Sequence, residues 1–473
     1  MNFLRIQAAG GYISPDKLQQ LASVSKKYAL GKIEVGFRQD LLVNSTSKQL
    51  SELRNQLGIN GFQVEEAHAT HPNVVSSMVA RNIFPKTSWL RSGDYLDILN
   101  SFTFAPRLKV NIIDPVQELI RPITGQLNFI AASDTPQFWY LALNFSVFDE
   151  IKIWPHLVDG EEIAEWTKAI EEVFFGRVSR DLQSRGRYAE AEPSRLNEQM
   201  DFQSIIQEVS KIFKGRTRPI LKELKLTPKP YPHHEGIYRY DDRYWIGLYQ
   251  RDNYFEADFL EALCQLCIDS KIGRIYPTPF KTLIIKSIPK ENIYEWEKLL
   301  GKFGIHSHHS SLELNWQLPD ADAAALSLKK ELVMAFERLK IRTSSLSFSI
   351  GLRDNETTST IIIEPLDTDY ERFRVVHSPD FYIGNTLWET FAGDVVRKNL
   401  PEILRRLTLK YYDQLTTERK SGLSRTKLNV QKSITQEVWQ CKHCLTICET
   451  QPELCPTCEA STEDFTLIEM VAL

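Results

Sequence analysis

Apolar positions near the start of the chain alternate between helical and strand-like spacing. After Ser14, a residue suited to cap a helix, apolar side chains recur every three or four residues up to Gly31, which predicts a helix. Residues 32–43 have the apolar character of a strand, and residues 47–57 return to helical spacing before Gly58-Ile59. The first part of the chain is therefore predicted as helix, strand, helix.

The same order returns far along the chain. Residues 259–267 are predicted as a helix, residues 274–285 as a strand and residues 295–303 as a second helix. In this alignment Phe280-Lys281 matches Phe37-Arg38, and Gly304-Ile305 matches Gly58-Ile59. Two such units so far apart indicate an internal duplication with pseudo-two-fold halves, although one helix–strand–helix unit also arises by chance.

The remaining segments supply further strands and helices. Apolar runs predict strands at 104–113, 128–132, 138–145, 346–351 and 360–364, and helical spacing marks 160–175, 197–213, 323–339 and 401–412. The charged stretch 177–187 is expected to be exposed, and the polar stretch 416–432 is expected to act as a tether. This mixture of elements predicts an α+β protein.

Composition narrows the class of protein. The chain of 473 residues is long enough for two or three domains, and its formal net charge of −4 argues against a general nucleic-acid binder. The first residues lack the apolar core of a signal peptide, and no apolar run is long enough to span a membrane. We therefore expect a cytoplasmic protein with neither a membrane nor a nucleic-acid partner.

The strongest chemical signal lies near the end of the chain, where two Cys-x-x-Cys pairs are separated by residues 445–454. Their members are Cys441, Cys444, Cys455 and Cys458. Each pair places two thiolates on a tight turn, so the four can converge on one metal at about 2.3 Å. Metal binding would then supply the folding energy of a tail too short to bury its own core. Free or disulfide-bonded cysteines are the alternative, but metal ligands suit a reducing compartment better.

The sequence around these cysteines resembles the rubredoxin family, especially the shortened rubredoxin-like domains appended to larger redox proteins. The resemblance rests on Trp439-x-Cys441-x-x-Cys444, on Pro452-Glu-x-Cys455-Pro456-x-Cys458 and on Phe465. It implies that the four cysteines bind one iron for electron transfer. Leu445 and Glu459 replace the glycines that usually follow each pair, and Cys448 is an extra thiol. A zinc ribbon with a purely structural metal is therefore the alternative.

Several short motifs in the body of the chain resemble the nitrite/sulfite reductase family. They are Gly10-Gly11 with Leu18, Arg38-Gln39, Arg81-Asn82-Ile83 and Pro106-Arg107-Leu108-Lys109. Gly36 stands where that family has a threonine. The resemblance runs over nearly all of the chain before the tether. It implies duplicated ferredoxin-like and α/β halves that hold a siroheme bridged to an iron–sulfur cluster.

By the same resemblance, four basic residues would surround the siroheme carboxylates and a small oxyanion such as sulfite or nitrite. They are Arg38, Arg81, Arg107 and Lys109. Guanidinium and ammonium groups in a partly dry pocket bind such anions and stabilise the charge that builds during reduction. The alternative for each residue is an ordinary surface charge.

The cysteines that bind the family's cluster are missing. Neither of the corresponding stretches, 313–329 and 347–355, contains a cysteine, so we expect no iron–sulfur cluster. Cys264 and Cys267 align with Ala22 and Ser25 of the first copy and are predicted as small core residues. Imidazoles offer other iron ligands at His233, His234, His306, His308 and His309. Otherwise we expect these histidines to be solvent-facing turn residues.

The resulting prediction has six segments: ferredoxin-like halves at 1–75 and 231–312, α/β domains at 76–230 and 313–415, a linker at 416–437 and a rubredoxin-like domain at 438–473. The favoured hypothesis is a redox protein with a rubredoxin-type iron centre and a redox protein as its partner, with or without siroheme in the body. The alternative is a non-catalytic, partner-binding scaffold with structural zinc. We find no phosphate-binding glycine loop and no Gly-x-Ser-x-Gly or His-Glu-x-x-His motif to support a hydrolase or transferase.

Overall fold

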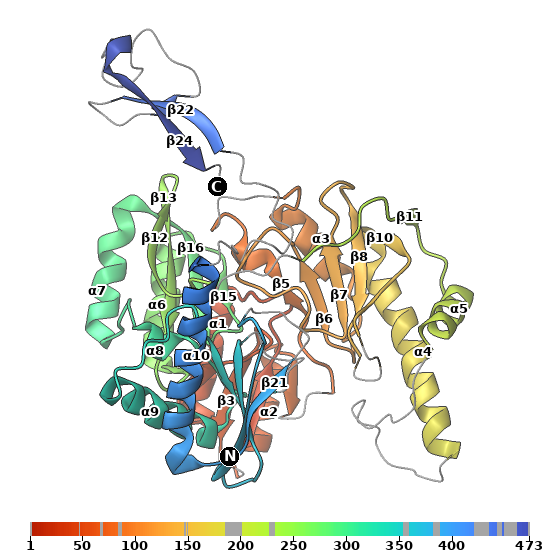
Figure 1. Ribbon diagram of the computed structural model, residues 1–473. Coiled ribbons are helices and arrows are strands. Elements are labelled where there is room, and N and C mark those ends of the chain that lie inside the picture. Colours follow the sequence, from red (N-terminus) through yellow and green to blue (C-terminus); the bar gives the residue numbers. More distant parts are fainter. Residues whose placement is uncertain are drawn as a thin grey trace. The chain divides into compact units, whose positions relative to one another are not determined.

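The computed structural model of the protein describes residues 2–46, 48–66, 70–83, 88–145, 148, 150–184, 201–226, 232–352, 359–381, 388–420, 435–441, 447–448 and 461–471. The chain divides into two compact units, residues 1–405 and 406–473. Figure 1 shows the helices and strands of both units. In the described ranges, no helix is long and apolar enough to cross a membrane.

The first ferredoxin-like domain is a five-stranded sheet in the order β14-β2-β3-β1-β4. Its elements are β1 (Asn2–Ile6), α1 (Pro15–Tyr28), β2 (Lys32–Val35), β3 (Leu41–Ser45), α2 (Leu50–Ile59), β4 (Val64–Glu66) and β14 (Tyr254–Glu256). Ser14 caps α1 by accepting a hydrogen bond from the Lys17 N–H, as its position predicts. Both predicted helices are confirmed, but the single strand predicted at 32–43 is a pair of antiparallel strands, β2 and β3, joined by a turn.

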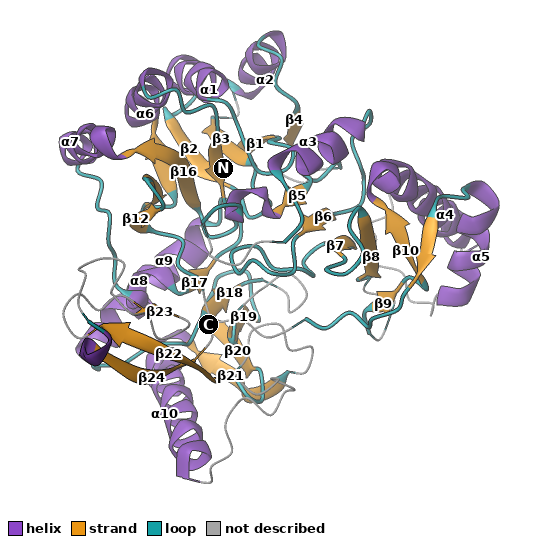
Figure 2. Cartoon of the chain, turned by 90° about the horizontal axis from the view of Figure 1, so that it is seen from above, coloured by secondary structure: helices purple, strands orange, loops and turns teal. Residues whose placement is uncertain are grey.

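The second ferredoxin-like domain repeats this plan. Its sheet has the order β12-β13-β16-β15, built from β12 (Gly236–Tyr240), β13 (Arg243–Tyr249), β15 (Ile275–Pro277) and β16 (Thr282–Pro289), with helices α6 (Ala257–Asp269) and α7 (Ile293–Phe303). Helices α1 and α6 pack side by side (Figure 2). The two halves of the chain also pair with each other. Strand β14, from the second half, pairs with β2, and Ile13, from the first half, pairs with Ile275 of β15. This reciprocal exchange gives the duplication its pseudo-two-fold character.

The first α/β domain has a sheet in the order β11-β10-β8-β7-β6-β5, with β9 beside β8. Its strands are β5 (Val75–Ser76), β6 (Val110–Ile113), β7 (Leu127–Ala131), β8 (Phe138–Leu143), β9 (Lys152–Ile153), β10 (His156–Asp159) and β11 (Thr217–Pro219). Its helices are η1 (Ser77–Ala80), α3 (Ser92–Ser101), η2 (Gly160–Glu162), α4 (Ile163–Ser184) and α5 (Phe202–Ile212). Helix α4 continues to Ser184, so most of the charged stretch 177–187 belongs to a helix.

The second α/β domain has the sheet order β17-β18-β19-β20-β21. Its elements are α8 (Ser311–Leu314), β17 (Trp316–Gln317), α9 (Ala323–Arg338), β18 (Phe348–Ile350), β19 (Ile361–Pro365), β20 (Arg372–His377), β21 (Glu389–Val396), η5 (Arg397–Asn399) and α10 (Leu400–Lys420). Like β5, β6 and β7, the strands β17, β18 and β19 run parallel, and an antiparallel pair follows each set. The duplication therefore includes both domains of each half. Helix α10 covers residues 416–420 of the predicted linker.

The glycine that ends the second helix of each ferredoxin-like domain is not the one predicted in the first half. Gly304 ends α7 with a φ of 63°, and the Ile305 N–H donates to Leu300 O at 2.9 Å. In the first half the same cap is made by Gly61, with a φ of 73°, and by Phe62, whose N–H donates to Leu57 O at 3.0 Å. The predicted match of Gly304-Ile305 to Gly58-Ile59 is therefore wrong, because Gly58-Ile59 still belong to α2.

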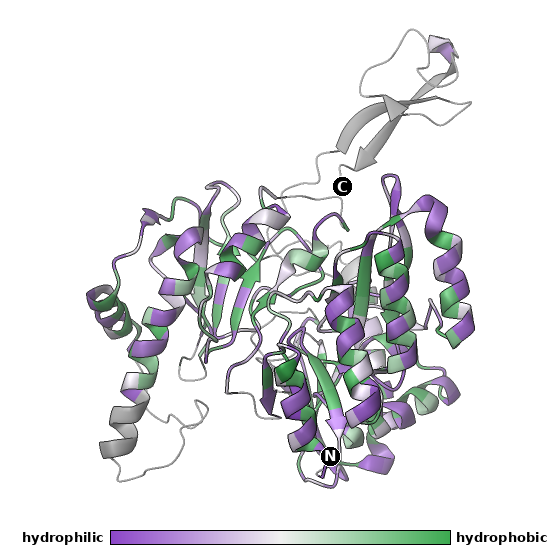
Figure 3. Ribbon diagram, turned by 180° about the vertical axis from the view of Figure 1, so that it is seen from behind, coloured by the Kyte–Doolittle hydropathy of each residue, from purple (hydrophilic) through white to green (hydrophobic). Residues whose placement is uncertain are grey.

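The described residues of the first unit include two large hydrophobic cores. One surrounds the sheet of the first α/β domain and includes Phe129 and Trp139, and the other lies between the ferredoxin-like sheets and their helices. The strands are mostly apolar, whereas the helices carry polar residues along one side (Figure 3). Cys264 and Cys267 are fully buried in the second core, and burial raises the pKa of both thiols. The prediction that they are core residues is confirmed.

The end of the chain forms a three-stranded antiparallel sheet in the order β23-β22-β24. Its strands are β22 (Thr435–Cys441), β23 (Ile447–Cys448) and β24 (Phe465–Val471). Trp439 of β22 pairs with Cys448 on one side and with Leu467 on the other. The described part of the predicted rubredoxin-like segment is therefore a small β-sheet.

Candidate functional site

Two equivalent turns, one from each half, lie at the meeting point of the ferredoxin-like domains. In the first turn Gln39 has a φ of 61° and its N–H donates to Gly36 O at 3.1 Å. In the second turn Lys281 has a φ of 59° and its N–H donates to Thr278 O at 3.1 Å. Lys281 is therefore the counterpart of Gln39, not of Arg38. The predicted alignment is wrong here by one residue, because backbone hydrogen bonds set the register and the Phe-Arg/Lys likeness does not.

Gly36 occupies the position where the resemblance leads us to expect a threonine, and the structure supplies a reason. A Cβ atom on Gly36 would lie 1.8 Å from Asp40 Oδ1, so this turn cannot hold both side chains in this arrangement. In the second turn Thr278 replaces Gly36 and Thr282 replaces Asp40, and their hydroxyl oxygens lie 2.6 Å apart. The two turns therefore share a backbone but carry different pairs of side chains.

Gln39 connects the first turn to the first α/β domain. It is fully buried, and its Oε1 accepts a hydrogen bond from the Ser76 N–H at 2.9 Å, at the end of β5. A Cβ atom on Gly11 would lie 2.4 Å from Gln39 Nε2, so this approach requires glycine at position 11. Two of the motifs found in the sequence, Gly10-Gly11 and Arg38-Gln39, are thus in direct contact.

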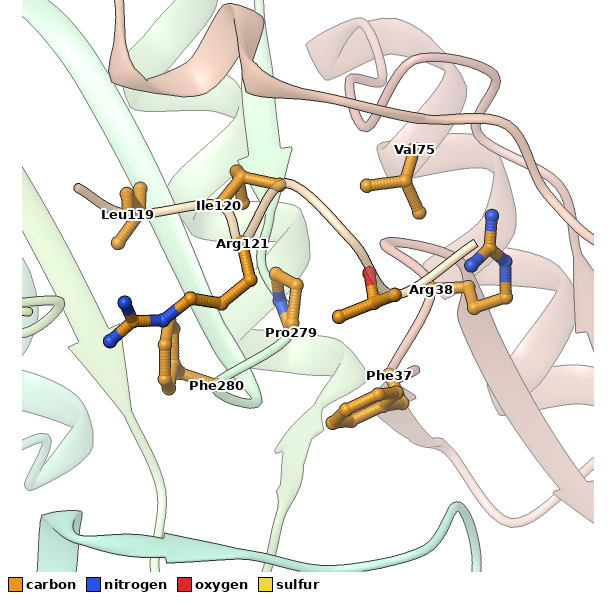
Figure 4. Close-up of a pocket in the computed structure, with 9 residues that line it drawn as sticks. Phe37, Arg38, Val75, Leu119, Ile120, Arg121, Pro279 and Phe280 are labelled. Carbon is orange, nitrogen blue, oxygen red and sulfur yellow. The ribbon is translucent and has the colours of Figure 1, made fainter. Parts of the chain in front are cut away.

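Arg38, a predicted anion-binding residue, turns its guanidinium toward the first α/β sheet. Its Nε donates to Asn73 O at 3.0 Å, and its Nη2 lies 3.0 Å from Val110 O and 3.2 Å from Asn111 Oδ1. Arg38 also lines a cavity of about 20 Å³ together with Phe37, Arg121 and Phe280, among other residues (Figure 4). A space of that size holds about one water molecule, so it does not fit a tetrapyrrole.

Lys281 belongs to a buried group of five charged side chains that the sequence did not reveal, here called the Lys281 cluster: Arg5, Glu34, Asp40, Lys281 and Asp320. Lys281 Nζ lies 3.0 Å from Glu34 Oε1 and also pairs with Asp320 Oδ1. Arg5 Nη1 lies 2.7 Å from Asp320 Oδ2 and 3.0 Å from Asp40 Oδ2. Because the exposed fraction of the Lys281 side chain is 6% and that of Asp320 is 8%, these charges are compensated by each other rather than by water.

Electrostatics within the Lys281 cluster keep Asp320 ionised. Burial disfavours its charge, but Lys281 and Arg5 outweigh burial and lower the pKa of Asp320 to about 2. For Lys281, burial is likewise outweighed, by Asp320 and Glu34, and its pKa is raised. Burial and the charge of Asp320 raise the pKa of Asp40. A sequence signal for this cluster did exist, since Arg5 in β1 and Glu34 in β2 each stand between two apolar residues.

Arg81, the second predicted anion-binding residue, follows η1 and lies near Lys286 of β16. Lys286 Nζ donates to the backbone oxygens of Met78 at 3.1 Å, Val79 at 2.9 Å and Arg81 at 2.9 Å. Burial, followed by the charges of Arg274 and Arg81, lowers the pKa of Lys286 to about 7. Arg81 thus belongs to a basic group that includes two residues of the second half, Arg274 and Lys286.

Arg107 and Lys109 lie where the chain enters β6. The Arg107 guanidinium stacks on the ring of Phe175 in α4, with 3.6 Å between the guanidinium carbon and the ring centroid. The backbone N–H of Arg107 donates to Glu171 Oε1 at 2.6 Å, and that of Lys109 donates to Gln126 Oε1 at 2.9 Å. Lys109 directly precedes Val110, whose carbonyl Arg38 binds, so Arg38 and Lys109 share one neighbourhood while the Arg107 side chain packs on α4.

The histidines fall into two groups. His233, His306 and His308 are exposed, as expected for turn residues. His234, by contrast, is buried and stacks on Phe280 with the ring centroids 4.6 Å apart, and burial lowers its pKa to about 3. The side chain of His309 is also buried and pairs with Glu235. The expectation of solvent-facing turn residues is therefore wrong for these two, which serve the packing of the second half.

The stretch 313–329, where cluster cysteines were sought, contains a buried ion pair instead. Lys329 Nζ lies 3.3 Å from Glu313 Oε2 and donates to the Tyr249 hydroxyl. Burial lowers the pKa of Lys329 to about 8, although the charge of Glu313 opposes this shift. An ammonium group and a carboxylate thus lie at the two ends of this stretch.

The four cysteines of the predicted metal site lie mostly outside the described residues. Cys441 is the last residue of β22, and its backbone pairs with that of Phe465. Its side chain, and Cys444, Cys455 and Cys458 as a whole, fall outside the described part of the chain. Within the described part, no three or more His, Cys, Asp or Glu residues are grouped so as to hold a metal ion. The four-cysteine metal site therefore stays a prediction.

Comparisons with known proteins agree with this architecture. The family model described as "Nitrite/Sulfite reductase ferredoxin-like half domain" matches residues 1–57. The solved structure of the NirA protein of Mycobacterium tuberculosis is similar to this one with a TM-score of 0.63 and 17% sequence identity, over 85% of this chain and 79% of that chain. No curated protein matches the chain. The body of the chain, with its two ferredoxin-like and two α/β domains, is therefore nitrite/sulfite reductase-like in fold.

Proposed function

We propose that this protein is a redox protein that carries one iron on Cys441, Cys444, Cys455 and Cys458, attached to a nitrite/sulfite reductase-like body without an iron–sulfur cluster. The observation that carries the proposal is the hairpin of β22 and β23. The first Cys-x-x-Cys pair begins at the last residue of β22, and β23 returns to pair with Trp439 and Gln440. A hairpin at this point favours the tight turn that two thiolates need to bind one metal.

The bound iron would supply one-electron chemistry, with thiolate ligation and solvent exposure setting its potential. The chain would contribute the four thiolates and the small sheet of β22, β23 and β24, in which Cys441 ends β22. Because the cluster cysteines are absent from 313–329 and 347–355, the body lacks ligands for an iron–sulfur cluster at those stretches. We infer that electrons pass to or from a redox partner protein in the cytoplasm.

Siroheme in the body is a variant of this proposal, with a small oxyanion as ligand. The described cavity that Arg38 lines does not fit it, because that cavity measures about 20 Å³. We therefore derive no reaction step through siroheme.

A second candidate function is a non-catalytic, partner-binding scaffold with a structural zinc, and the ion pair of Lys329 and Glu313 favours it. This pair lies in one of the two stretches where a cluster-binding body would need cysteines, so the stretch carries compensated charges in place of cluster ligands. A zinc-bound tail would then stabilise the chain without exchanging electrons.

One measurement separates these functions. The full-length protein is purified in air, and its visible absorption spectrum and metal content are determined on the same sample. One iron per chain, with sulfur-to-iron charge-transfer bands that bleach on addition of dithionite, supports the redox proposal. A Soret band together with stoichiometric extractable siroheme supports the variant. A colourless protein with one zinc overturns the redox proposal and leaves the scaffold.

A further inference from the structure

Asp320 is held as proteins hold a bound anion. Its Oδ1 accepts a hydrogen bond from the Phe37 N–H at 2.8 Å and from Lys281 Nζ, and its Oδ2 accepts one from Arg5 Nη1 at 2.7 Å. Two cations and one backbone N–H around a single carboxylate are the usual components of an oxyanion site. Arg5 and Phe37 belong to the first ferredoxin-like domain and Lys281 to the second, so both halves build this site.

The carboxylate is presented by a short segment after β17. Residues 319–323 line a shallow, open groove of about 410 Å³. Ala321 has a φ of 53°, a left-handed conformation that alanine rarely adopts, and its N–H donates to Glu34 Oε1 at 3.1 Å. Asp320 and Ala321 thus contact the first half through three of its residues, and the segment holds an unfavourable backbone conformation while it does so.

Asp322, two residues further on, faces a different set of partners. It caps α9 by accepting hydrogen bonds from the N–H groups of Ala324 at 3.0 Å and Ala325 at 2.9 Å. Its second oxygen accepts from the Tyr370 hydroxyl at 2.6 Å. Asp322 therefore anchors the segment to its own domain, whereas Asp320 anchors it to the ferredoxin-like domains.

We propose that the two ferredoxin-like domains jointly form a binding site for a small carboxylate-type anion, and that Asp320 fills this site as an internal ligand. The segment 319–323 then acts as a latch between the second α/β domain and both ferredoxin-like domains. Removal of the carboxylate would leave Lys281 and Arg5 undercompensated and the Phe37 N–H without its acceptor, with space for a free carboxylate. This inference involves no metal and is independent of the function proposed above.

The test is chemical rescue of the full-length Asp320→Ala variant by formate, which is a carboxylate without a tether. Melting temperatures of wild type and variant are measured in increasing sodium formate, with sodium chloride at the same ionic strength as reference. We expect D320A to melt lower than wild type and to regain several degrees with a saturable dependence on formate. Wild type should show no saturable response in the same range, because Asp320 already occupies the site.

Asp322→Ala is the matched control, because it removes the same charge from the same segment without touching Arg5 or Lys281. D322A should lose stability through the missing helix cap and should not recover in formate. The proposal is overturned if formate raises the melting temperature of D320A no more than that of D322A, or no more than chloride does. If D320A is recovered only as aggregate, the amount of soluble protein refolded in formate against chloride is the readout, and equal yields also overturn it.

Discussion

Gln39 and Lys281 occupy the same left-handed position of two equivalent turns, with φ values of 61° and 59°, yet they bind their neighbours by different chemistry. Gln39 accepts a hydrogen bond from Ser76 at the end of β5, whereas Lys281 forms an ion pair with Asp320 just after β17. Since β5 and β17 begin equivalent sheets, each turn fastens its ferredoxin-like domain to the α/β domain of its own half. The two turns therefore share a backbone conformation, but one carries a neutral amide and the other an ammonium group.

Loss of the Lys281 ammonium should destabilise the body strongly. In Lys281→Met, Asp320 and Glu34 keep buried charges without their main partner, and removing one member of a buried pair costs about 3–5 kcal/mol. Adding Glu34→Gln should recover part of the loss, since it removes one of the two stranded charges. Urea unfolding measures both variants, and Lys298→Met, at an exposed lysine of α7, should match wild type. A K281M protein as stable as K298M would show that the cluster contributes nothing.

Threonine at position 36 should be tolerated only if Asp40 changes with it. In Gly36→Thr the new Cβ would lie 1.8 Å from Asp40 Oδ1, so the turn must shift, at a cost of about 1–3 kcal/mol. The double variant Gly36→Thr with Asp40→Thr reproduces the pair found at Thr278 and Thr282 and should be more stable than G36T alone. A double-mutant cycle of unfolding free energies gives the coupling. Additive effects would contradict the steric explanation.

Acid should destabilise the second half through His234. A histidine in the unfolded chain has a pKa of about 6.5, whereas burial lowers the pKa of His234 to about 3. Between these values the unfolded state binds a proton that the folded state does not, so stability falls as the pH drops from about 6.5, by at most about 1.4 kcal/mol per unit. Urea midpoints from pH 7 to pH 4.5 should therefore fall less in His234→Phe than in wild type. The exposed-site variant His308→Phe should behave as wild type does.

Lys286 should titrate near neutral pH, and Arg81 should contribute to that. Incorporation of ¹³C,¹⁵N-labelled lysine makes each lysine side chain visible by NMR without chemical modification, and the signal lost in Lys286→Arg assigns this residue. We expect a pKa of about 7 in wild type and a higher pKa in Arg274→Met and Arg81→Met, because each removes a neighbouring positive charge. Exposed lysines in the same samples serve as the internal reference. An unchanged Lys286 titration in both variants would remove Arg81 from this basic group.

Metal content should depend on four cysteines and not on the fifth nearby. Cys455→Ser removes one predicted ligand, so we expect loss of bound metal and of the fold of the tail, because metal binding supplies that folding energy. Cys448→Ser removes the extra thiol beside the first pair and should keep one metal per chain. Metal analysis, together with titration of the thiols in denaturant, distinguishes the Cys455→Ser variant from the Cys448→Ser variant. Equal loss in both variants would mean that Cys448 is itself a ligand.

Local features of the fold were readable from the sequence. The Ser14 cap, the helices around Leu18 and Leu263 and most strands follow from the spacing of apolar residues, which reports the burial of one face. The duplication was also visible, but its register was not. Likeness of Phe280-Lys281 to Phe37-Arg38 suggested one alignment, and the turn hydrogen bonds of Gln39 and Lys281 set another.

Some features of the candidate site could be recognised in the sequence, and others required the fold. The amino-acid sequence was enough to recognise the four cysteines and their spacing, the absence of cysteines at 313–329 and 347–355, and the basic residues that resemble an anion site. The fold was needed to show that Lys281 and Arg5 pair with Asp320, and that Arg38 binds the backbone oxygens of Asn73 and Val110. Which charges pair in a buried site depends on how segments distant in the sequence pack, and the free energy of a buried charge is set by the partner that packing brings to it.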